Sequence, residues 1–347
     1  MNKILLILVA LLLVPCACVA GATHPVIFAS YAGNGAQLHD AAIMTESVRD
    51  FGGRVKDAPI WIYAPEGLLK KQRDLVKKLV ALGAQVKASE VPGGSRDVPS
   101  AGKVFAAAKA EGEANGASAV LVWMDNDTVV LKDPEDLLLA EGKSLGYRPV
   151  AYQNIGSLYA DPPDALWSSL YRKLSVPTSA LFPMKTAADG KTLRPYFDAG
   201  LLVVRPERGI MKKWAQSFSV LCGDPEFVEM CRKSERTSTF LYQAAFAGAI
   251  LNLVHQGEMV ELPGEYNYPL FFKELYGGDR EFHTIDNVIT LRHDVFFEKP
   301  ASGWAAKLKG PAGTISWLER RFGGGEDRKQ ETSTKMRYRF QHGGKKG

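Results

Sequence analysis

Two carboxylates lie one residue apart in the turn Asp125-Asn126-Asp127, directly after the apolar residues 119–124. Carboxylates placed in this way can converge on one hard divalent cation, since such cations prefer oxygen ligands. The bound cation can then hold diphosphate oxygens and stabilise the negative charge that develops on them. An ordinary turn between a strand and a helix near Pro134 would use the same residues without metal. The pattern by itself leaves both interpretations open.

The residues before this turn predict alternating strands and helices, because short apolar runs are separated by longer segments with helical periodicity. The expected strands are residues 25–30, 59–63, 85–88 and 119–124, and the expected helices are residues 37–51, 66–82 and 101–113. This βαβα order predicts an α/β fold whose mostly parallel sheet lies between two helical layers. Ligands bind beyond the carboxyl ends of the strands in such folds. The turn at residues 125–127 is therefore expected at the binding edge of the sheet.

Residues 120–134, with the sequence VLVWMDNDTVVLKDP, resemble the metal-binding segment of the glycosyltransferase family that includes glycogenin and bacterial galactosyl- and glucosyltransferases. Further segments resemble that family in the same order: YFDAGLLVV at 196–204, LP and YNY within 262–268, and His293 followed by Lys299-Pro300 and Trp304. The resemblance covers most of residues 25–305. It implies the three-layer α/β/α fold of the nucleotide-diphospho-sugar transferases, which is called GT-A.

The resemblance implies a metal site and a donor site. Asp125, Asp127 and His293 would hold Mn²⁺, or Mg²⁺ in its place, since an imidazole beside carboxylates suits manganese. Lys109 and Lys299 would contact the diphosphate of the donor. Without the resemblance, His293 would be a strand-end histidine bonded to a backbone group, and both lysines would be ordinary surface residues.

The resemblance also implies residues near the donor sugar. Asp198 and Gly200 would face it, with glycine allowing the backbone to come close. Gln243 corresponds to the glutamine of the family's Asp-Gln pair, so Asp198 and Gln243 are the candidate catalytic residues. The alternative is that Asp198 and Gly200 simply open a buried strand.

The sequence departs from the family pattern at several positions. Tyr242 stands where the family has the aspartate before Gln243, and Phe296 and Phe297 occupy the stretch where the family has a glycine. The change at Tyr242 bears on recognition of the donor sugar and on catalysis. Asn126-Asp127-Thr128 also fits an N-glycosylation sequon, although a folded turn would be expected to escape modification.

The leading hypothesis is a metal-dependent glycosyltransferase that moves a hexose from a nucleoside diphosphate sugar, with a UDP-sugar expected, to a glycan, lipid or protein acceptor. Retention of the anomeric configuration is implied by the resemblance alone. Residues 161–195, with a helix expected near residues 163–174, are the predicted lid or acceptor region. Two other classes stay open: a binding or scaffold protein without transferase activity, and a secreted metal-dependent phosphoester or diphosphate hydrolase.

The N-terminus predicts export of the protein. Lys3 precedes an apolar run over residues 4–14, and Ala20-Gly21-Ala22 fits a signal-peptide cleavage site, so residues 1–22 are expected to be a secretory signal. An uncleaved membrane anchor is the alternative, because residues 4–22 carry no charge. Both interpretations predict the secretory pathway rather than the cytoplasm.

The C-terminus predicts a basic tail after a single domain at residues 23–318. Residues 319–347 contain nine Lys or Arg and four Asp or Glu, which accounts for the net charge of +5 of the whole chain. We expect this tail to be disordered, with weak contact to an anionic membrane surface as its alternative role. Nucleic acid is not an expected partner, because basic residues are not interleaved with aromatic residues on a folded element.

Cys222 and Cys231 are the two cysteines that follow the presumed signal. In a secreted chain they could close a disulfide loop around Gly223-Asp224-Pro225, and a pair of buried thiols is the alternative. No spacing of cysteine and histidine resembles a zinc site.

Overall fold

The computed structural model describes residues 24–270, 283–293 and 303–322. The expected signal or anchor, Lys299, Phe296, Phe297 and residues 323–347 of the expected tail lie outside these ranges. Within them, none of the helices combines the length and the apolar character that crossing a membrane requires.

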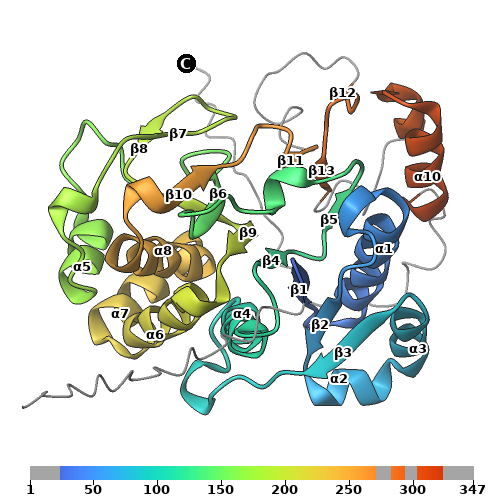
Figure 1. Ribbon diagram of the computed structural model, residues 1–347. Helices are drawn as coiled ribbons and strands as arrows, with labels where there is room; N and C mark the ends of the chain where they lie inside the picture. The colour runs from blue at the N-terminus through green and yellow to red at the C-terminus, as the bar shows by residue number, and fades with distance from the viewer. Residues whose placement is uncertain (1–23, 271–282, 294–302, 323–347) are drawn as a thin grey trace, which may run out of the picture.

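A seven-stranded sheet forms the centre of the molecule (Figure 1). In spatial order its strands are β10 (Met259–Glu261), β6 (Leu145–Pro149), β9 (Phe197–Val204), β4 (Leu121–Met124), β1 (Ile27–Tyr31), β2 (Ile60–Ala64) and β3 (Ala84–Ala88). β4, β1, β2 and β3 pair in parallel, whereas β9 runs antiparallel to both of its neighbours. The expected mostly parallel sheet is confirmed.

Helices cover both faces of this sheet (Figure 1). The helices are α1 (Gly35–Phe51), α2 (Glu66–Lys71), α3 (Arg73–Ala81), α4 (Ala101–Ala114), α5 (Ala165–Lys173), α6 (Ile210–Gly223), α7 (Pro225–Lys233), α8 (Glu235–Leu253) and α10 (Ala312–Phe322). Successive residues of a strand point to opposite faces. Ile27 and Ala29 accordingly pack in a core with α4, α6 and α8, while Val26 and Phe28 pack in a core with α1 and α3. The three layers predicted from the sequence are confirmed.

Short strands and 3-10 helices complete the described chain. The strands are β5 (Thr128–Val130), β7 (Met184–Lys185), β8 (Thr192–Leu193), β11 (Tyr268–Pro269), β12 (His283–Thr284), β13 (Thr290–Arg292) and β14 (Leu308–Lys309). The 3-10 helices are η1 (Gly53–Val55), η2 (Gly93–Ser95), η3 (Glu135–Leu137), η4 (Thr178–Ala180), η5 (Pro206–Arg208), η6 (Gln256–Glu258) and η7 (Trp304–Lys307).

Two predicted helices differ in detail from the observed ones. The segment at residues 66–82 is divided into α2 and α3 at Gln72, whose backbone (φ −103°, ψ 46°) leaves the helical region. The helix expected near residues 163–174 is α5, whose N-cap Asp164 accepts a hydrogen bond from the backbone N–H of Trp167. The buried Trp167 indole also donates to the Ile155 carbonyl over 2.6 Å, which anchors this part of the predicted acceptor region.

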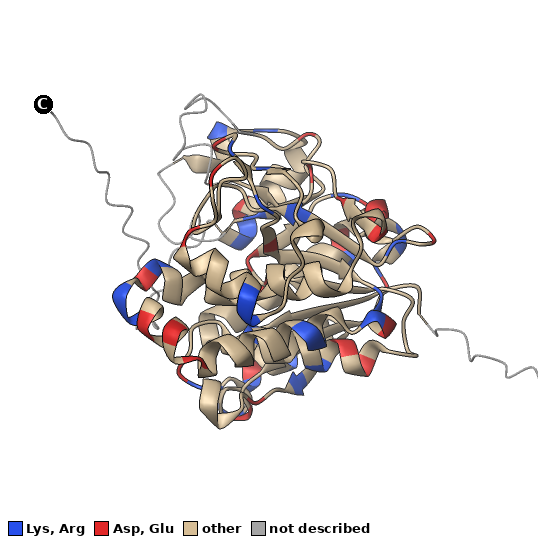
Figure 2. Cartoon of the chain, turned by 90° about the vertical axis from the view of Figure 1, so that its left-hand side faces the viewer, with Lys and Arg blue, Asp and Glu red and all other residues tan. Residues whose placement is uncertain are grey.

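The surface that carries α5 to α8 mixes positive and negative side chains (Figure 2). Two ion pairs join α5 to the start of α7, Arg172 with Glu226 and Lys173 with Asp224. Charges of both signs are thus paired across neighbouring helices on this surface.

The two cysteines at the α6–α7 junction are free thiols. Burial, with a smaller contribution from the neighbouring Cys231, raises the pKa of Cys222 to about 12. Burial also raises the pKa of Cys231. Of the two alternatives left open by the sequence, the structure has the pair of thiols.

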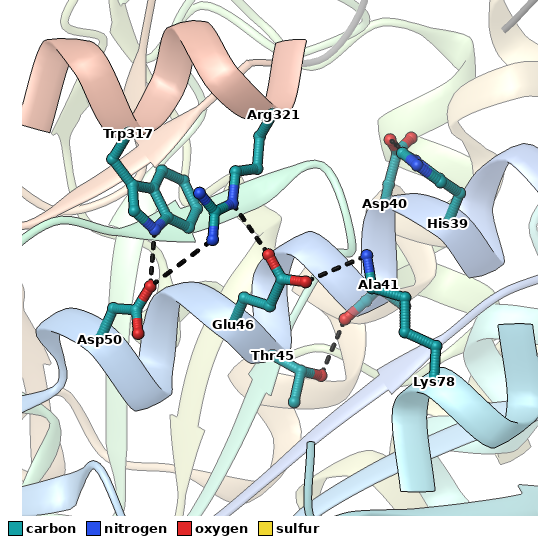
Figure 3. Close-up of polar contacts among 9 residues, drawn as sticks. All are labelled: His39, Asp40, Ala41, Thr45, Glu46, Asp50, Lys78, Trp317 and Arg321. Carbon is teal, nitrogen blue, oxygen red and sulfur yellow. Dashed lines mark hydrogen bonds and ion pairs between the residues drawn. The ribbon is translucent and has the colours of Figure 1, made fainter. Parts of the chain in front are cut away.

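The last described helix, α10, is fastened to α1 by a polar network (Figure 3). The Trp317 indole donates to Asp50 over 2.6 Å, and Arg321 donates to Glu46 over 2.9 Å. Lys78 of α3 lies 3.0 Å from the same Glu46 carboxylate. Burial of Glu46 opposes ionisation, but the bonds from both cations outweigh it and lower its pKa. α10 continues to residue 322, so the folded part reaches beyond residue 318.

Candidate functional site

The antiparallel pairing of β9 with β4 places Asp125 beside Gly200. Met124 pairs with Leu201 at the end of β4, and the next backbone N–H, that of Asp125, donates to the Gly200 carbonyl over 2.7 Å. Asp125 is therefore held at the carboxyl end of a central parallel strand. This is the edge of the sheet at which the sequence predicts the binding site.

Asp198 turns back onto the same glycine. Its Oδ1 accepts a hydrogen bond of 2.7 Å from the Gly200 backbone N–H. A β-carbon at Gly200 would lie 2.9 Å from this Oδ1 and 3.4 Å from Asp125 Oδ2. A side chain larger than that of glycine would therefore have to displace Asp198 Oδ1, whereas its contact with Asp125 would be of ordinary length.

A second, small sheet brings His293 beside Asp127. β5 follows the turn at residues 125–127 and pairs antiparallel with β13, so that Thr128 lies opposite Arg292. One residue further, the His293 backbone N–H donates to the Asp127 carbonyl over 2.8 Å. The His293 side chain is 1% exposed, and its ring lies 4.7 Å from that of Phe322 in α10.

Two cations that the sequence did not single out neutralise these carboxylates. Lys103 of α4 lies 2.7 Å from Asp125 Oδ2. Arg292 of β13 lies between two aspartates, with Nη1 3.3 Å from Asp198 Oδ2 and Nε 3.7 Å from Asp127 Oδ2. Because Arg292 directly precedes the candidate ligand His293, its position in the sequence could have indicated that it belongs to the site.

Lys109, which the sequence predicts near the donor phosphates, lies on α4 six positions after Lys103. Its ammonium donates to the Ala88 carbonyl over 2.7 Å and lies 3.9 Å from Glu113. Within the described residues, these contacts lie away from the three aspartates. The structure brings Lys103 of this helix to the aspartates instead.

Tyr242 of α8 faces the same cluster. Lys103 Nζ lies 5.2 Å from the centre of its ring. Burial raises the pKa of Tyr242, and the nearby charges of Asp125 and Asp198 raise it further. The residue that replaces the family aspartate is therefore a neutral phenol beside the carboxylates. Gln243 is buried on the same helix, and no hydrogen bond within the described residues links it to the three aspartates.

Asn126 connects the turn to the end of β1. Its amide donates to the Tyr31 carbonyl over 2.6 Å, and the residue is buried. Because this amide is used inside the fold, it is poorly placed for glycosylation of the folded protein. The bond also joins the carboxyl end of β1 to the candidate metal turn.

The chemistry of the turn suits a hard divalent cation, although its carboxylates are ion-paired as they stand. Asp127 Oδ1 is buried, and no described residue donates a hydrogen bond to it. Burial raises the pKa of Asp125 to about 6, against the lowering effect of Lys103. Within the described ranges, no group of three or more His, Cys, Asp or Glu side chains is gathered for metal binding. A cation at this turn would therefore compete with Lys103 and Arg292 for the carboxylate oxygens.

Solved structures similar to this chain include several glycosyltransferases. The galactosyltransferase LgtC, in complex with donor and acceptor sugar analogues, has a TM-score of 0.48 and 13% identity, over 90% of this chain and 99% of that one. Mouse xyloside xylosyltransferase 1 has a TM-score of 0.42 and 11% identity, over 78% and 97%. The bifunctional glycosyltransferase WbbM has a TM-score of 0.42 and 15% identity. The match covers 72% of this chain but only 40% of the WbbM chain.

At TM-scores below 0.5 and identities of 11–15%, these similarities do not assign a function to the chain. Among curated proteins, none matches this sequence significantly. The model of the family described as the Rhodobacterales glycosyltransferase domain matches residues 31–253, which is more than half of the 347-residue chain and includes Asp125, Asp127, Asp198 and Gly200. The chain therefore belongs to this family of glycosyltransferases.

Proposed function

We propose that the protein transfers a hexose from a nucleoside diphosphate sugar, with a UDP-sugar as the first candidate, to a glycan acceptor. The observation that carries this proposal is the convergence of Asp125 and Asp198 on Gly200, with Asp127 in the adjoining turn, at the carboxyl end of β4. The family membership supplies the class of reaction. Lipid and protein acceptors remain further possibilities for the test.

Asp125 and Asp127 would hold the metal ion, Mn²⁺ first and Mg²⁺ second, with His293 as a further ligand. When bound, the ion would stabilise negative charge on the departing diphosphate. Lys103 and Arg292 lie where they could turn from the carboxylates to the same phosphate oxygens. Lys299 stays a predicted phosphate contact outside the described residues.

The donor sugar would lie against Asp198 and Gly200. Both carboxylates near this glycine can accept hydrogen bonds from sugar hydroxyl groups. Gln243 stays a candidate catalytic residue on the basis of the family resemblance, which is also the basis for expecting a retained anomeric configuration. Inverted configuration in the product would remove this part of the proposal.

The location follows from residues 1–22, which we propose direct the chain to the secretory pathway. Contact of the basic tail with a membrane surface stays a prediction. Residues 161–195, which include α5 and the β7–β8 hairpin, stay the proposed acceptor region.

Calorimetric titration of UDP into the purified chain, with and without Mn²⁺, tests the proposal. We expect binding that depends on Mn²⁺ and that the double variant Asp125→Ala/Asp127→Ala loses. The matched control is Asp133→Ala/Glu135→Ala, which removes two carboxylates of the same segment that pair with Arg54. Equal loss of binding in the control would count against the assigned site, and no UDP binding by the unchanged chain would contradict the proposal.

Turnover separates this proposal from the scaffold alternative, which the phenol at Tyr242 favours. Consumption of a UDP-hexose that accelerates with an added glycan indicates transfer, whereas equal consumption in water alone indicates a hydrolase. Tight binding of UDP and metal without any turnover would indicate a scaffold that has kept only the donor site.

A further inference from the structure

Asn267 is held in a demanding backbone conformation next to the site. Its φ of 51° lies in the left-handed region, which asparagine tolerates better than most residues other than glycine. The backbone N–H donates to Thr290 Oγ1 over 2.7 Å. The following strand, β11, pairs with β13, the strand that carries Arg292. Asn267 is thus fixed by the same small sheet that positions Asp127.

The side-chain oxygen of Asn267 is buried beside two aspartates without a donor. The residue is 7% exposed, and no described group donates a hydrogen bond to Oδ1. This Oδ1 lies 3.6 Å from the position that a β-carbon of Gly200 would take. The same position is 2.9 Å from Asp198 Oδ1 and 3.4 Å from Asp125 Oδ2. Three acceptor oxygens therefore surround one point that glycine leaves open.

The other two oxygens, Asp198 Oδ1 and Asp125 Oδ2, already accept hydrogen bonds from the protein. The Gly200 N–H donates to Asp198 Oδ1, and Lys103 donates to Asp125 Oδ2. Burying an amide oxygen without a hydrogen bond costs free energy, and a water molecule or a ligand can supply the missing donor. At Asn267 the two aspartates of the site favour a ligand. Since Lys103 and Arg292 already balance much of the local negative charge, a neutral hydroxyl suits this point better than a further cation.

We propose that Asn267 is a donor-sugar residue whose Oδ1 accepts a hydrogen bond from a hydroxyl group of the hexose. The inference rests on the proposed function, in which Asp198 and Gly200 face that sugar. It makes Asn267 a determinant of sugar specificity, because a hydrogen-bond acceptor that is fixed in position binds best to a sugar with a hydroxyl at the matching place on the ring.

Calorimetry with UDP and with UDP-hexoses, in the presence of Mn²⁺, tests this role in Asn267→Gly. Glycine tolerates the left-handed conformation, so the variant removes the amide with little backbone strain. We expect unchanged affinity for UDP and a loss of about five- to tenfold for the preferred UDP-hexose, the size of one hydrogen bond. The preference between UDP-glucose and UDP-galactose, which differ in one hydroxyl configuration, should shrink if that hydroxyl is the one bound.

Asn154→Gly is the matched control, because Asn154 also has a left-handed backbone (φ 50°) and a buried Oδ1 without a donor. It should leave both affinities unchanged, and thermal melting of both variants should show that they fold. Equal weakening of UDP and UDP-hexose in Asn267→Gly, or no change in either, would overturn the inference while leaving the proposed function standing. Weaker binding of Mn²⁺ alone would make Asn267 a metal ligand and also overturn it. Failure of the unchanged chain to bind any nucleotide would instead reject the proposed function, and this inference with it.

Discussion

Arg292 joins carboxylates that come from different parts of the sheet. Asp127 follows β4, Asp198 belongs to β9, and the guanidinium of Arg292 reaches both from β13. A partly buried carboxylate that loses its only cation keeps the cost of its desolvation without the attraction that offset it. The ion pairs of Arg292 should therefore support the stability of the apo protein as well as the shape of the site.

We predict that Arg292→Gln lowers the free energy of unfolding by about 1–3 kcal/mol, measured by urea denaturation without metal. Asp198→Asn should cost less in the Arg292→Gln background than in the unchanged chain, which a double-mutant cycle measures directly. Arg54→Gln is the control, because the Arg54 guanidinium pairs with Asp133 and Glu135 and with none of the three aspartates of the site. Strict additivity of Arg292→Gln with Asp198→Asn would show that the two groups do not interact.

At the scale of elements, α10 packs against His293, the residue that directly follows β13. The helix packs on α1 through the Trp317 and Arg321 contacts (Figure 3). Its Phe322 ring lies against that of His293. The edge-to-face contact of Phe51 with Trp317, with ring centres 5.4 Å apart, adds an apolar component. Docking of α10 and the position of His293 should therefore be coupled.

Arg321→Met should lower the free energy of unfolding by about 1 kcal/mol. Glu46 would lose one of its two cations, and Lys78 alone would offset less of the desolvation cost of its carboxylate. Arg232→Met is the control, since Arg232 pairs with Glu229 on the surface of α7 and should contribute almost nothing. Thermal or chemical denaturation of both variants makes the comparison. Equal effects of the two substitutions would contradict a specific role for the α10–α1 network.

At the scale of the whole molecule, one buried carboxylate makes stability depend on pH. Glu111 of α4 is 2% exposed and accepts hydrogen bonds from the backbone N–H groups of Met211 and Lys212 at the start of α6. Burial raises its pKa to about 7, although the backbone hydrogen bonds act in the opposite direction. Between its ordinary pKa and about 7, the folded protein therefore binds more protons at Glu111 than the unfolded chain does.

Since the folded state holds the extra proton, stability contributed by Glu111 should decline as pH rises from 5 to 7. Glu111→Gln should remove this decline. The difference in unfolding free energy, variant minus unchanged chain, should therefore increase by about 1–3 kcal/mol between pH 5 and pH 7. Urea denaturation at several pH values provides the measurement. Glu113→Gln should not reproduce the gain, because Lys87 and Tyr63 outweigh burial and lower the pKa of Glu113. A constant difference between Glu111→Gln and the unchanged chain would refute the assignment.

The sequence determined the layers of this protein and the position of its candidate metal turn. Apolar strands and periodic helices are local patterns, and the order in which they alternate restricts the topology to a few parallel arrangements. Asp125 and Asp127 were found in this way, because they directly follow a strand. Asp198, Gly200 and His293 were found through the family resemblance. Asp198 and Gly200 lie beside Asp125, and the backbone of His293 bonds to that of Asp127.

Only the tertiary structure decided which other side chains join these residues. Lys103 and Lys109 lie on the same helix, and the packing of α4 against β1 and β4 brings Lys103 to Asp125. Arg292 and Asn267 meet the aspartates through the pairing of β13 with β5 and β11, elements that are far apart in the chain. Such meetings depend on strand register and helix rotation, which are set by the whole fold rather than by the residues next to them in the sequence.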